Sequence, residues 1–373
     1  MRKLNRNKTE VIFAGTFNPQ EKLSGSEKVA KRIFEAYTKN HQSVFIDYFL
    51  DGKKYGIIKK LFGHELVQEV NGSPVLKTGI FKLILTVLKC RPRIIHLITY
   101  ERFYSILFFL RPLFRYKIIY NVHGIRIYEN EINGSSISTS LKHKDKTCEK
   151  LIFKRSDKLL FLSQNSFNLA SKYYQLNKAK TQFIKNGVDE IFHKISVNKN
   201  FKNNVLKIVF VGEVINKLKG FDFLLNALRK LNFSVELYVI SDSRIETSNS
   251  EKLILTFHKR MDTVDFANFL KDKTVYVSAS KSDSFSITAV ECMSAGLIPI
   301  LTNQTGSSEL IDNNVNGFAF NFNDENSLIN ILIELNGNQE LQNRISSESK
   351  KIYNELSWTK VCESYVKIYE NML

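Results

Sequence analysis

One stretch, residues 275–320, constrains the fold of this chain more than any other. It begins with alternating apolar residues from Val275 to Ala279, which predict a short buried strand. After a polar loop, apolar residues recur at the spacing of one helix face, and Gly296 marks the end of that helix. A second apolar run, Leu297–Leu301, follows. A strand, a helix and a strand in this order indicate parallel strands, so the stretch predicts an α/β sheet.

The loop and the first helical turn of this unit are suited to bind a phosphate. Unpaired backbone N–H groups and the positive end of a helix dipole meet at such a turn. Two carboxylates flank it, those of Asp283 and Glu291. They would repel a phosphate but can accept hydrogen bonds from hydroxyl groups, so we expect them to hold a sugar and a ribose. The residues expected to bind the diphosphate are Ser284, Phe285, Ser286, Ile287 and Thr288.

The same residues resemble a known family signature. Ser280, Asp283 and Glu291 have the spacing of the conserved polar residues in S-x-x-E-G-F-G-L-P-x-x-E-A-M-A-x-G-x-P-V, the signature of glycosyltransferase family 4. The following segment, TNQTGSSELIDNNVNGF, is similar to that family's A-x-x-x-G-G-x-x-E-x-I-x-x-x-x-x-G-F. The resemblance covers about forty residues in order. The alternative is an ordinary α/β crossover without this function.

The resemblance implies a GT-B fold, in which two Rossmann-like parallel-sheet domains face each other across a cleft. The chain is long enough for two domains. We expect an acceptor-binding domain over 1–190, a donor-binding domain over 205–356, and a C-terminal helix within 357–373 that packs back onto the first domain. The turn 186–189 resembles the family's I-P-N-G-V-D, and the polar segment 190–204 is expected to be a linker.

The first predicted strand, Glu10–Gly15, leads through a loop to a helix predicted over Glu27–Tyr37. Ser26 is a plausible N-cap of this helix. A strand, loop and helix at the start of a sheet can cradle a phosphate. Because family 4 enzymes carry a Gly-Gly pair here, we expect Gly25 and Ser26 to contact the donor. The polar segment 51–78 has no clear period, so we draw no chemical conclusion from it.

A fourth strand, Lys117–Val122, ends in His123 at the sheet edge where α/β proteins bind ligands. A histidine there is also often a satisfied structural residue. The resemblance implies that His123 lies near the donor sugar, where it would orient the sugar or stabilise developing charge. Arg126 is a candidate ligand for a phosphate or the acceptor, or else a solvent-exposed arginine. Residues 129–140 are rich in Asn, Ser and Gly and predict a flexible loop.

The second domain opens with a strand that ends at Val211, followed by Gly212, Glu213 and a loop to Lys219. This segment resembles the family's G-R-x-x-x-x-K-G, in which the arginine and the lysine bind the donor diphosphate. Gly212 and Lys219 match, but the loop is one residue longer, so Lys217 is an alternative ligand. Glu213 replaces the arginine, and a carboxylate cannot bind a diphosphate. That contact must be absent, or be supplied by Lys217 or by the basic first domain.

The basic charge of the chain is concentrated in its first half. Residues 1–200 carry 36 Lys and Arg against 16 Asp and Glu, whereas residues 201–373 carry 18 against 21. Two apolar segments with basic neighbours, Ile80–Leu88 and Phe103–Tyr116, also lie in this half. They predict either contact with a membrane surface or helices that cover a sheet. A Lys-rich composition without any anionic partner is the alternative explanation of the charge.

Four separated cysteines without a C-x-x-C pair predict reduced thiols in a cytoplasmic protein. The N-terminus lacks the apolar core of a signal peptide, and no apolar run is long enough for a transmembrane helix. Together with the basic half, this predicts a cytoplasmic protein that is peripheral on the inner face of the cell membrane.

The resemblance implies transfer of a sugar from a nucleoside diphosphate sugar with retention at the anomeric carbon. No D-x-D motif stands at a strand end, so Lys219, helix N-termini and Arg126 are expected to neutralise the diphosphate without a metal or other cofactor. The usual acceptors of this family and the basic charge of the first half of the chain favour an anionic lipid-linked acceptor, such as a growing bacterial lipopolysaccharide or capsule. The alternatives are a sugar-nucleotide epimerase of the same fold and a non-catalytic GT-B partner subunit, which Glu213 favours. Nucleic acid is not expected, because no recognition motif is present.

Overall fold

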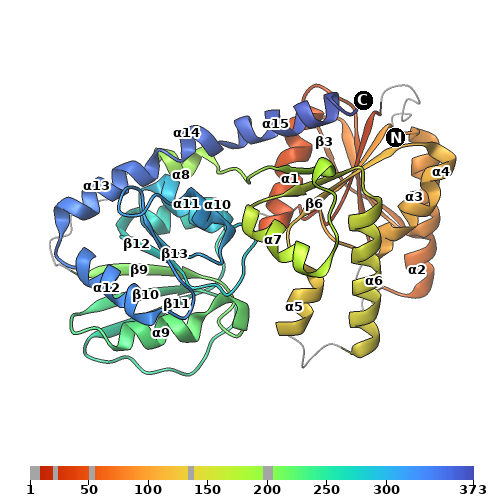
Figure 1. Ribbon diagram of the computed structural model, residues 1–373. Helices are drawn as coiled ribbons and strands as arrows, with labels where there is room; N and C mark the ends of the chain where they lie inside the picture. The colour runs from red at the N-terminus through yellow and green to blue at the C-terminus, as the bar shows by residue number, and fades with distance from the viewer. Residues whose placement is uncertain (1–8, 20–23, 50–54, 133–137, 196–204) are drawn as a thin grey trace.

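The computed structural model describes residues 9–19, 24–49, 55–132, 138–195 and 205–373. The chain forms two α/β domains, each built on one sheet with helices on both faces (Figure 1). The first sheet has eight strands: β1 Val11–Ala14, β2 Val44–Tyr48, β3 His64–Val70, β4 Ser73–Thr78, β5 Ile94–Leu97, β6 Lys117–Val122, β7 Lys158–Phe161 and β8 Thr181–Phe183. The second sheet has six: β9 Leu206–Val211, β10 Val235–Ile240, β11 Leu253–His258, β12 Val275–Ser278, β13 Ile298–Thr302 and β14 Phe318–Phe320.

Both sheets are parallel, with one exception at an edge. The strand orders are β3-β4-β2-β1-β5-β6-β7-β8 and β11-β10-β9-β12-β13-β14, and β3 alone is antiparallel to its neighbour. Parallel strands are buried on both faces, which is why their sequences read as short continuous apolar runs. In both sheets the order departs from the sequence order near the centre. This places the carboxyl ends of β1, β5 and β6 side by side, as it does those of β9 and β12.

The helices divide between the faces of the sheets. The helices of the first domain are α1 Gly25–Thr38, α2 Ile57–Phe62, α3 Ile80–Cys90, α4 Ser105–Phe114, α5 Arg126–Ile132, α6 Thr139–Arg155, α7 Gln164–Tyr173 and α8 Glu190–Lys194. Those that follow β9 are α9 Phe221–Arg229, α10 Thr263–Phe269, α11 Ile287–Ala295, α12 Glu325–Leu335, α13 Gln339–Lys350, α14 Tyr353–Leu356 and α15 Trp358–Glu370. Buried side chains of α3, α4 and α6 form one core with the first sheet, and α1 and α15 cover its other face.

Three points of the sequence analysis need to be completed or corrected. The segment without a clear period contains α2 and the β3–β4 hairpin, whose turn is Asn71-Gly72 with positive φ at both residues. That dipeptide is a hairpin signal which could have located the turn. The N-cap of α1 is Ser24 rather than Ser26, and its N–H donates to Glu27 at 2.7 Å.

The third point concerns the flexible loop predicted over 129–140, and this prediction is wrong. Residues 126–132 form α5 and α6 begins at Thr139, while 133–137 lie outside the described residues. The start of α5 is held by the buried carboxylate of Glu149, which accepts from the N–H groups of Arg126 at 2.7 Å and Ile127 at 3.2 Å. A helix this short depends on such a tertiary contact, which local composition does not reveal. Residues 196–204 of the predicted linker also lie outside the described residues.

The C-terminal helix α15 crosses from the second domain to the first and packs against α1 (Figure 1). Two of its tyrosines, Tyr365 and Tyr369, belong to a buried hydrogen-bond network beside the first sheet. Asn121 donates to the Tyr365 hydroxyl at 2.7 Å, His96 Nε2 donates to the Asn121 oxygen at 3.0 Å, and the Tyr369 hydroxyl donates to His96 Nδ1 at 2.8 Å. Burial lowers the pKa of His96 to about 4, so its ring is neutral. Each side chain of this network then has a hydrogen-bond partner.

We predict that Tyr369→Phe destabilises the protein by about 1–3 kcal/mol, because buried His96 Nδ1 loses its hydrogen-bond donor. Urea unfolding measures the effect. The matched control is Tyr173→Phe, which removes a hydroxyl bound to Glu131 at the surface. Equal losses of unfolding free energy in the two variants would contradict the structural role of the buried hydrogen-bond network.

Candidate functional site

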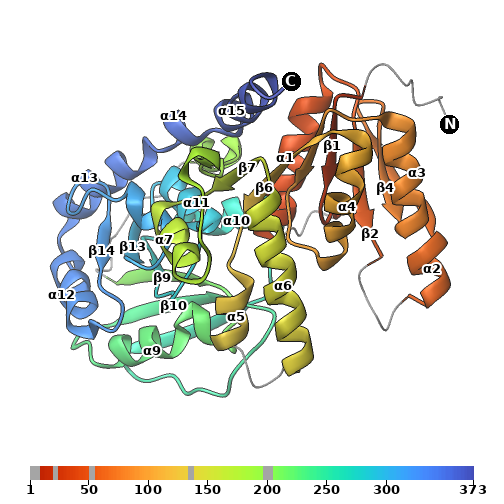
Figure 2. The ribbon, with the colours of Figure 1, turned by 45° about the vertical axis from the view of Figure 1, so that its right-hand side comes forward.

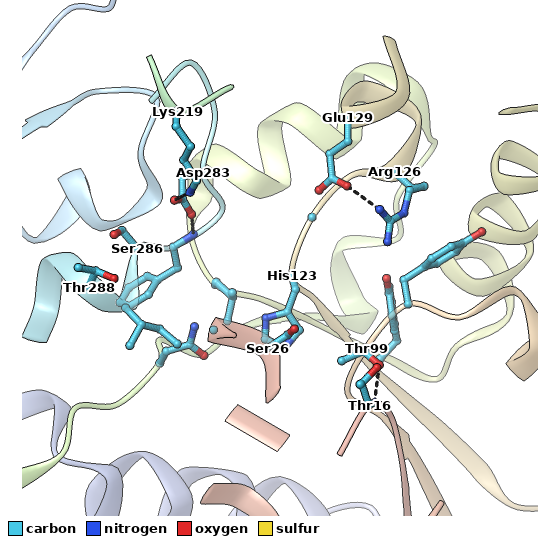
Figure 3. Close-up of a pocket in the computed structure, with 18 of the residues that line it drawn as sticks. Thr16, Ser26, Thr99, His123, Arg126, Glu129, Lys219, Asp283, Ser286 and Thr288 are labelled. Atoms are coloured by element: carbon cyan, nitrogen blue, oxygen red, sulfur yellow. Dashed lines mark hydrogen bonds and ion pairs between the residues drawn. The ribbon is translucent and has the colours of Figure 1, made fainter. Parts of the chain in front are cut away.

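A cavity of about 490 Å³ lies between the two domains, within the size range of small-molecule sites. Its walls come from the carboxyl ends of strands in both sheets and from the first turns of α1 and α11 (Figure 3). The following residues predicted from sequence line it: Gly25, Ser26, His123, Arg126, Lys219, Asp283, Phe285, Ser286, Ile287 and Thr288. Of the other predicted residues, Gly212, Lys217, Ser284 and Glu291 are not among its lining residues.

On the second-domain wall, Lys219 and Asp283 form an ion pair. Lys219 Nζ lies 2.9 Å from Asp283 Oδ2, and the charge of Asp283 raises the pKa of Lys219. The other carboxylate oxygen accepts from the N–H of Phe285 at 3.2 Å. Gly220, directly after the lysine, has φ +68°, and a Cβ there would meet the Ala279 carbonyl oxygen at 1.9 Å. Only glycine therefore allows this loop to lie against the end of β12 and present Lys219 to the cavity.

The first turn of α11 forms the adjacent wall. Ser286 is its N-cap, and its hydroxyl accepts from the N–H of Ala289 at 3.1 Å. Within the described residues, the N–H groups of Ile287 and Thr288 have no hydrogen-bond partner. Figure 3 shows Ser286 and Thr288 beside the Lys219–Asp283 pair. A cation and the positive end of a helix dipole thus lie on one wall, as an anionic ligand requires.

His123 lies on the first-domain wall, opposite this pair (Figure 3). Burial lowers its pKa to about 4, so the ring is neutral at neutral pH. Its Nε2 atom is buried and has no hydrogen-bond partner among the described residues. A neutral imidazole with an unpaired nitrogen can orient a hydroxyl, but it carries no positive charge. Which of the two suggested roles His123 has stays a prediction.

Arg126 is held on the cavity wall. Its guanidinium lies 3.1 Å from the Glu129 carboxylate and 5.3 Å from the centre of the Tyr100 ring. Glu129 also approaches the backbone of Gly124, where a Cβ would lie 2.1 Å from its oxygen. The arginine is therefore a fixed, partly neutralised cation of the site rather than a freely exposed one.

Glu291 lies at the domain interface. It is 5 % exposed and forms an ion pair with Lys28, which α1 of the first domain supplies. Lys28 also lies 3.5 Å from Asp189, and Arg32 lies 2.7 Å from the same aspartate. Burial disfavours the charge of Lys28, but Glu291 and Asp189 outweigh it and raise the lysine pKa. This cluster joins α1, α11 and the turn that ends the first domain.

Glu213, which replaces the expected arginine, is held away from the cavity. Its carboxylate accepts from the hydroxyl of Ser243 at 2.7 Å and from the N–H of the same residue at 3.0 Å. The hydroxyl bond contributes most to lowering the Glu213 pKa, so the group is ionised. Arg260, which follows β11, places its Nη2 atom 3.5 Å from this carboxylate. A guanidinium is therefore present beside the substituted position, and sequence reasoning missed it because it is distant in the chain.

The remaining predicted residues lie around the cavity rather than in its lining. Lys217 is exposed. Gly212 has φ +155° and packs beside Lys219, where a Cβ would lie 3.1 Å from Cγ. The Ser284 carbonyl accepts from the Ser163 hydroxyl at 2.9 Å, which ties the loop to the first domain. These residues support the positions of the lining residues.

Sequence reasoning also missed part of the first-domain wall. Thr16 follows β1, and Thr99, Tyr100 and Glu101 follow β5; all four line the cavity. The Thr16 N–H donates to Thr99 Oγ1 at 3.1 Å and joins the two loops. The available signal was their position after two predicted strands, since ligands bind beyond the carboxyl ends of parallel strands.

Within the described ranges, no three His, Cys, Asp or Glu side chains are placed to hold a metal ion. None of the helices described is both long and apolar enough to span a membrane.

We predict that Lys28→Met destabilises the protein by about 3–5 kcal/mol, because it leaves the buried carboxylate of Glu291 without its cation. In the Lys28→Met/Glu291→Gln double variant the loss should be smaller than the sum of the single losses. Urea unfolding measures both. Lys31→Met, on the same helix, is the control, with an expected effect within about 0.5 kcal/mol. A Lys28 effect no larger than the Lys31 effect would refute the role of the cluster.

Comparison with known proteins gives three kinds of similarity. Residues 192–352 match the family model described as glycosyl transferases group 1. An uncharacterised glycosyltransferase of Methanocaldococcus jannaschii is 27% identical over 255 residues, which are 63% of this chain and 72% of the relative. The UDP-Gal:alpha-D-GlcNAc-diphosphoundecaprenol alpha-1,3-galactosyltransferase of Escherichia coli is 23% identical over 274 residues, 69% of each chain.

The similarity of fold covers the whole chain. Sucrose-phosphate synthase from Thermosynechococcus elongatus has a TM-score of 0.77 at 14% identity, over 98% of this chain and 99% of that one. The predicted arrangement of two parallel-sheet domains is thereby confirmed. The exact domain boundaries stay predictions.

Proposed function

We propose that this chain, a glycosyltransferase of the GT-B fold, transfers a sugar from a nucleoside diphosphate sugar to a glycan acceptor with retention at the anomeric carbon. One observation carries the proposal. A single cavity between the sheets holds the Lys219–Asp283 pair, the free first turn of α11 and neutral His123 (Figure 3). The cation and the helix end suit a diphosphate, and the other two groups suit sugar hydroxyls.

The donor would lie along the second-domain wall. The N–H groups of Ile287 and Thr288 would bind the diphosphate together with Lys219, whose ammonium has three donors and can keep its bond to Asp283. Asp283 would accept hydrogen bonds from the sugar, and His123 would orient it. As the bond to the diphosphate breaks, these fixed cationic and N–H groups stabilise the charge that develops on the leaving oxygen, without a metal.

Glu291 remains the candidate for the ribose. Lys28 binds its Oε1 atom, so Oε2 is left to accept from a ribose hydroxyl. Helix α1 of the first domain would then be linked to the bound donor through the Lys28–Glu291 ion pair. Arg260 would supply a guanidinium near the diphosphate end, where the family motif places its arginine.

The acceptor would be a lipid-linked surface glycan, and the protein would lie on the inner face of the membrane. An apolar face supports this proposal. Phe62 of α2 stacks on Phe81 of α3 with ring centres 4.7 Å apart, and Lys82 and Lys89 are exposed beside them. The side chains of this apolar face are Ile57, Ile58, Phe62, Leu66, Phe81, Leu85 and Leu88, each at least 40 % exposed.

The place of the apolar face suits membrane contact. Helices α2 and α3 lie at the end of the first domain farthest from the second domain (Figures 1 and 2). The inner side of the Ile80–Leu88 segment covers the sheet, and its outer side is exposed and available for the proposed membrane contact. The E. coli relative, whose name specifies a diphosphoundecaprenol acceptor, supports the same class of acceptor.

A non-catalytic GT-B partner subunit is the second candidate. Glu213 favours it, because this carboxylate stands where the family motif has an arginine and is firmly held by Ser243. The complete wall of Lys219, Asp283 and the α11 turn favours the enzyme.

The donor test is hydrolysis of a panel of UDP-, GDP- and ADP-sugars by the purified protein. We expect slow release of one nucleoside diphosphate, reduced about 10²–10³-fold in Lys219→Ala and in Asp283→Asn, because each removes a contact to the donor. The control is Lys230→Ala, an exposed lysine paired with Glu325. If no donor is hydrolysed and none raises the melting temperature, the partner-subunit proposal replaces the enzyme.

The membrane prediction is tested by cosedimentation with vesicles. Wild type should bind phosphatidylglycerol vesicles better than phosphatidylcholine vesicles, and Ile58→Glu/Phe62→Glu should lose most of this binding. Ile333→Glu is the matched control, because this isoleucine is 51 % exposed on a helix of the second domain. Equal binding by all three proteins would contradict the apolar face as the contact.

A further inference from the structure

The cavity is lined by three carboxylates, and only one of them lacks a partner. Asp283 is paired with Lys219, and Glu129 with Arg126. The carboxylate of Glu101 has no hydrogen bond or ion pair with any residue of the described ranges, although its backbone carbonyl accepts from the N–H of Tyr104 at 3.1 Å. It belongs to the first-domain wall, whereas the donor groups proposed above lie on the second-domain wall. An unpaired carboxylate therefore faces the space that an acceptor would enter.

The surroundings of the Glu101 carboxyl group bring its pKa close to neutral pH. It directly follows the β5 loop and precedes the short helix Arg102–Tyr104. Burial raises its pKa to about 7; the charges of Asp47 and Asp145 add to this effect, and those of Arg126 and Arg102 oppose it. These four residues come from β2, α6, α5 and the short helix, so charges of both signs face the carboxyl group.

We propose that Glu101 binds the attacking hydroxyl of the acceptor and receives its proton. This inference rests on the proposed transfer reaction. The hydroxyl oxygen forms a bond to the anomeric carbon of the donor sugar on the same face from which the diphosphate departs, as retention requires. The bond from that carbon to the diphosphate breaks, and its electron pair leaves with the diphosphate. The hydroxyl proton passes to a carboxylate oxygen of Glu101, which later releases it to solvent.

The chemistry of this position also restricts the acceptor. A carboxylate accepts a hydrogen bond from a hydroxyl, whereas it repels a carboxylate or phosphate at the same point. Thr16 and Thr99 nearby offer neutral hydroxyls, and the ring of Tyr100 offers an apolar surface on which a sugar can pack. The reacting unit of the acceptor is therefore a neutral sugar, and any anionic group of the acceptor lies away from Glu101.

The test compares transfer with donor binding in the full-length protein. Transfer is measured as incorporation of radiolabelled sugar, from the donor that the panel identifies, into membranes of source cells that lack the gene. At pH 8, Glu101→Gln should reduce transfer about 10²–10⁴-fold, while the donor-induced rise in melting temperature stays close to that of wild type. Glu131→Gln is the matched control, because its carboxylate is exposed and bound to Tyr173.

A pH profile separates a chemical role from a structural one. Transfer by the wild type should rise through about pH 7 as Glu101 ionises. Glu101→Asp, which keeps the acid but shortens the side chain, should restore part of the rate and the rise with pH. Glu101→Gln should lack that rise.

Each other outcome overturns the inference. Normal transfer by Glu101→Gln would show that the carboxylate is not needed. Loss of the donor-induced rise in melting temperature along with transfer would place Glu101 with the donor or the folded state. If the wild type hydrolyses a donor but labels no membrane acceptor, the proposed acceptor is wrong, and this inference with it. If it does neither, the proposed function itself fails, which is a distinguishable result.

Discussion

The structure depends on a buried group of charges where the two domains meet. Lys28 of α1 binds Glu291 of α11 and lies beside Asp189, which Arg32 also binds. Separating the domains would leave the Glu291 carboxylate without its cation, so the Lys28–Glu291 pair favours one relative position of the sheets. In that position the carboxyl ends of β1, β5 and β6 face the first turn of α11, and the cavity between them has its walls from both domains.

The charged groups that line the cavity differ between its first-domain wall and its second-domain wall. On one wall, Lys219 and the free N–H groups of α11 create a positive region, and the paired Asp283 neutralises part of its charge. On the other wall, His123 is neutral and Glu101 is unpaired, so hydroxyl groups are better ligands there than anions. Under the proposed function, this asymmetry would give the two substrates different places, with the diphosphate on the second-domain wall and the reacting hydroxyl on the first-domain wall.

Much of the fold was predictable, because parallel strands and helices that cover them have strong local patterns. The strand and helix on either side of the 280–286 loop are present within a residue or two of the prediction. The failures share a physical cause. The helix α5 exists because Glu149, over twenty residues away, holds its first N–H groups. The hairpin at 71–72 was marked only by a two-residue turn signal, in a segment with half-exposed strands.

The sequence by itself determined the fold class and the residues of the second-domain wall, because the strand, turn and helix that carry Asp283 and Ser286 are continuous in the chain. It also identified His123, which stands at the end of a predicted strand. Only the tertiary structure decided which charges are paired and which are unpaired. Lys28 reaches Glu291 across 263 residues, Arg260 reaches Glu213 across 47, and Glu101 has no such partner in the described chain. Pairing depends on distances between side chains of different elements, and local patterns contain no information on those distances.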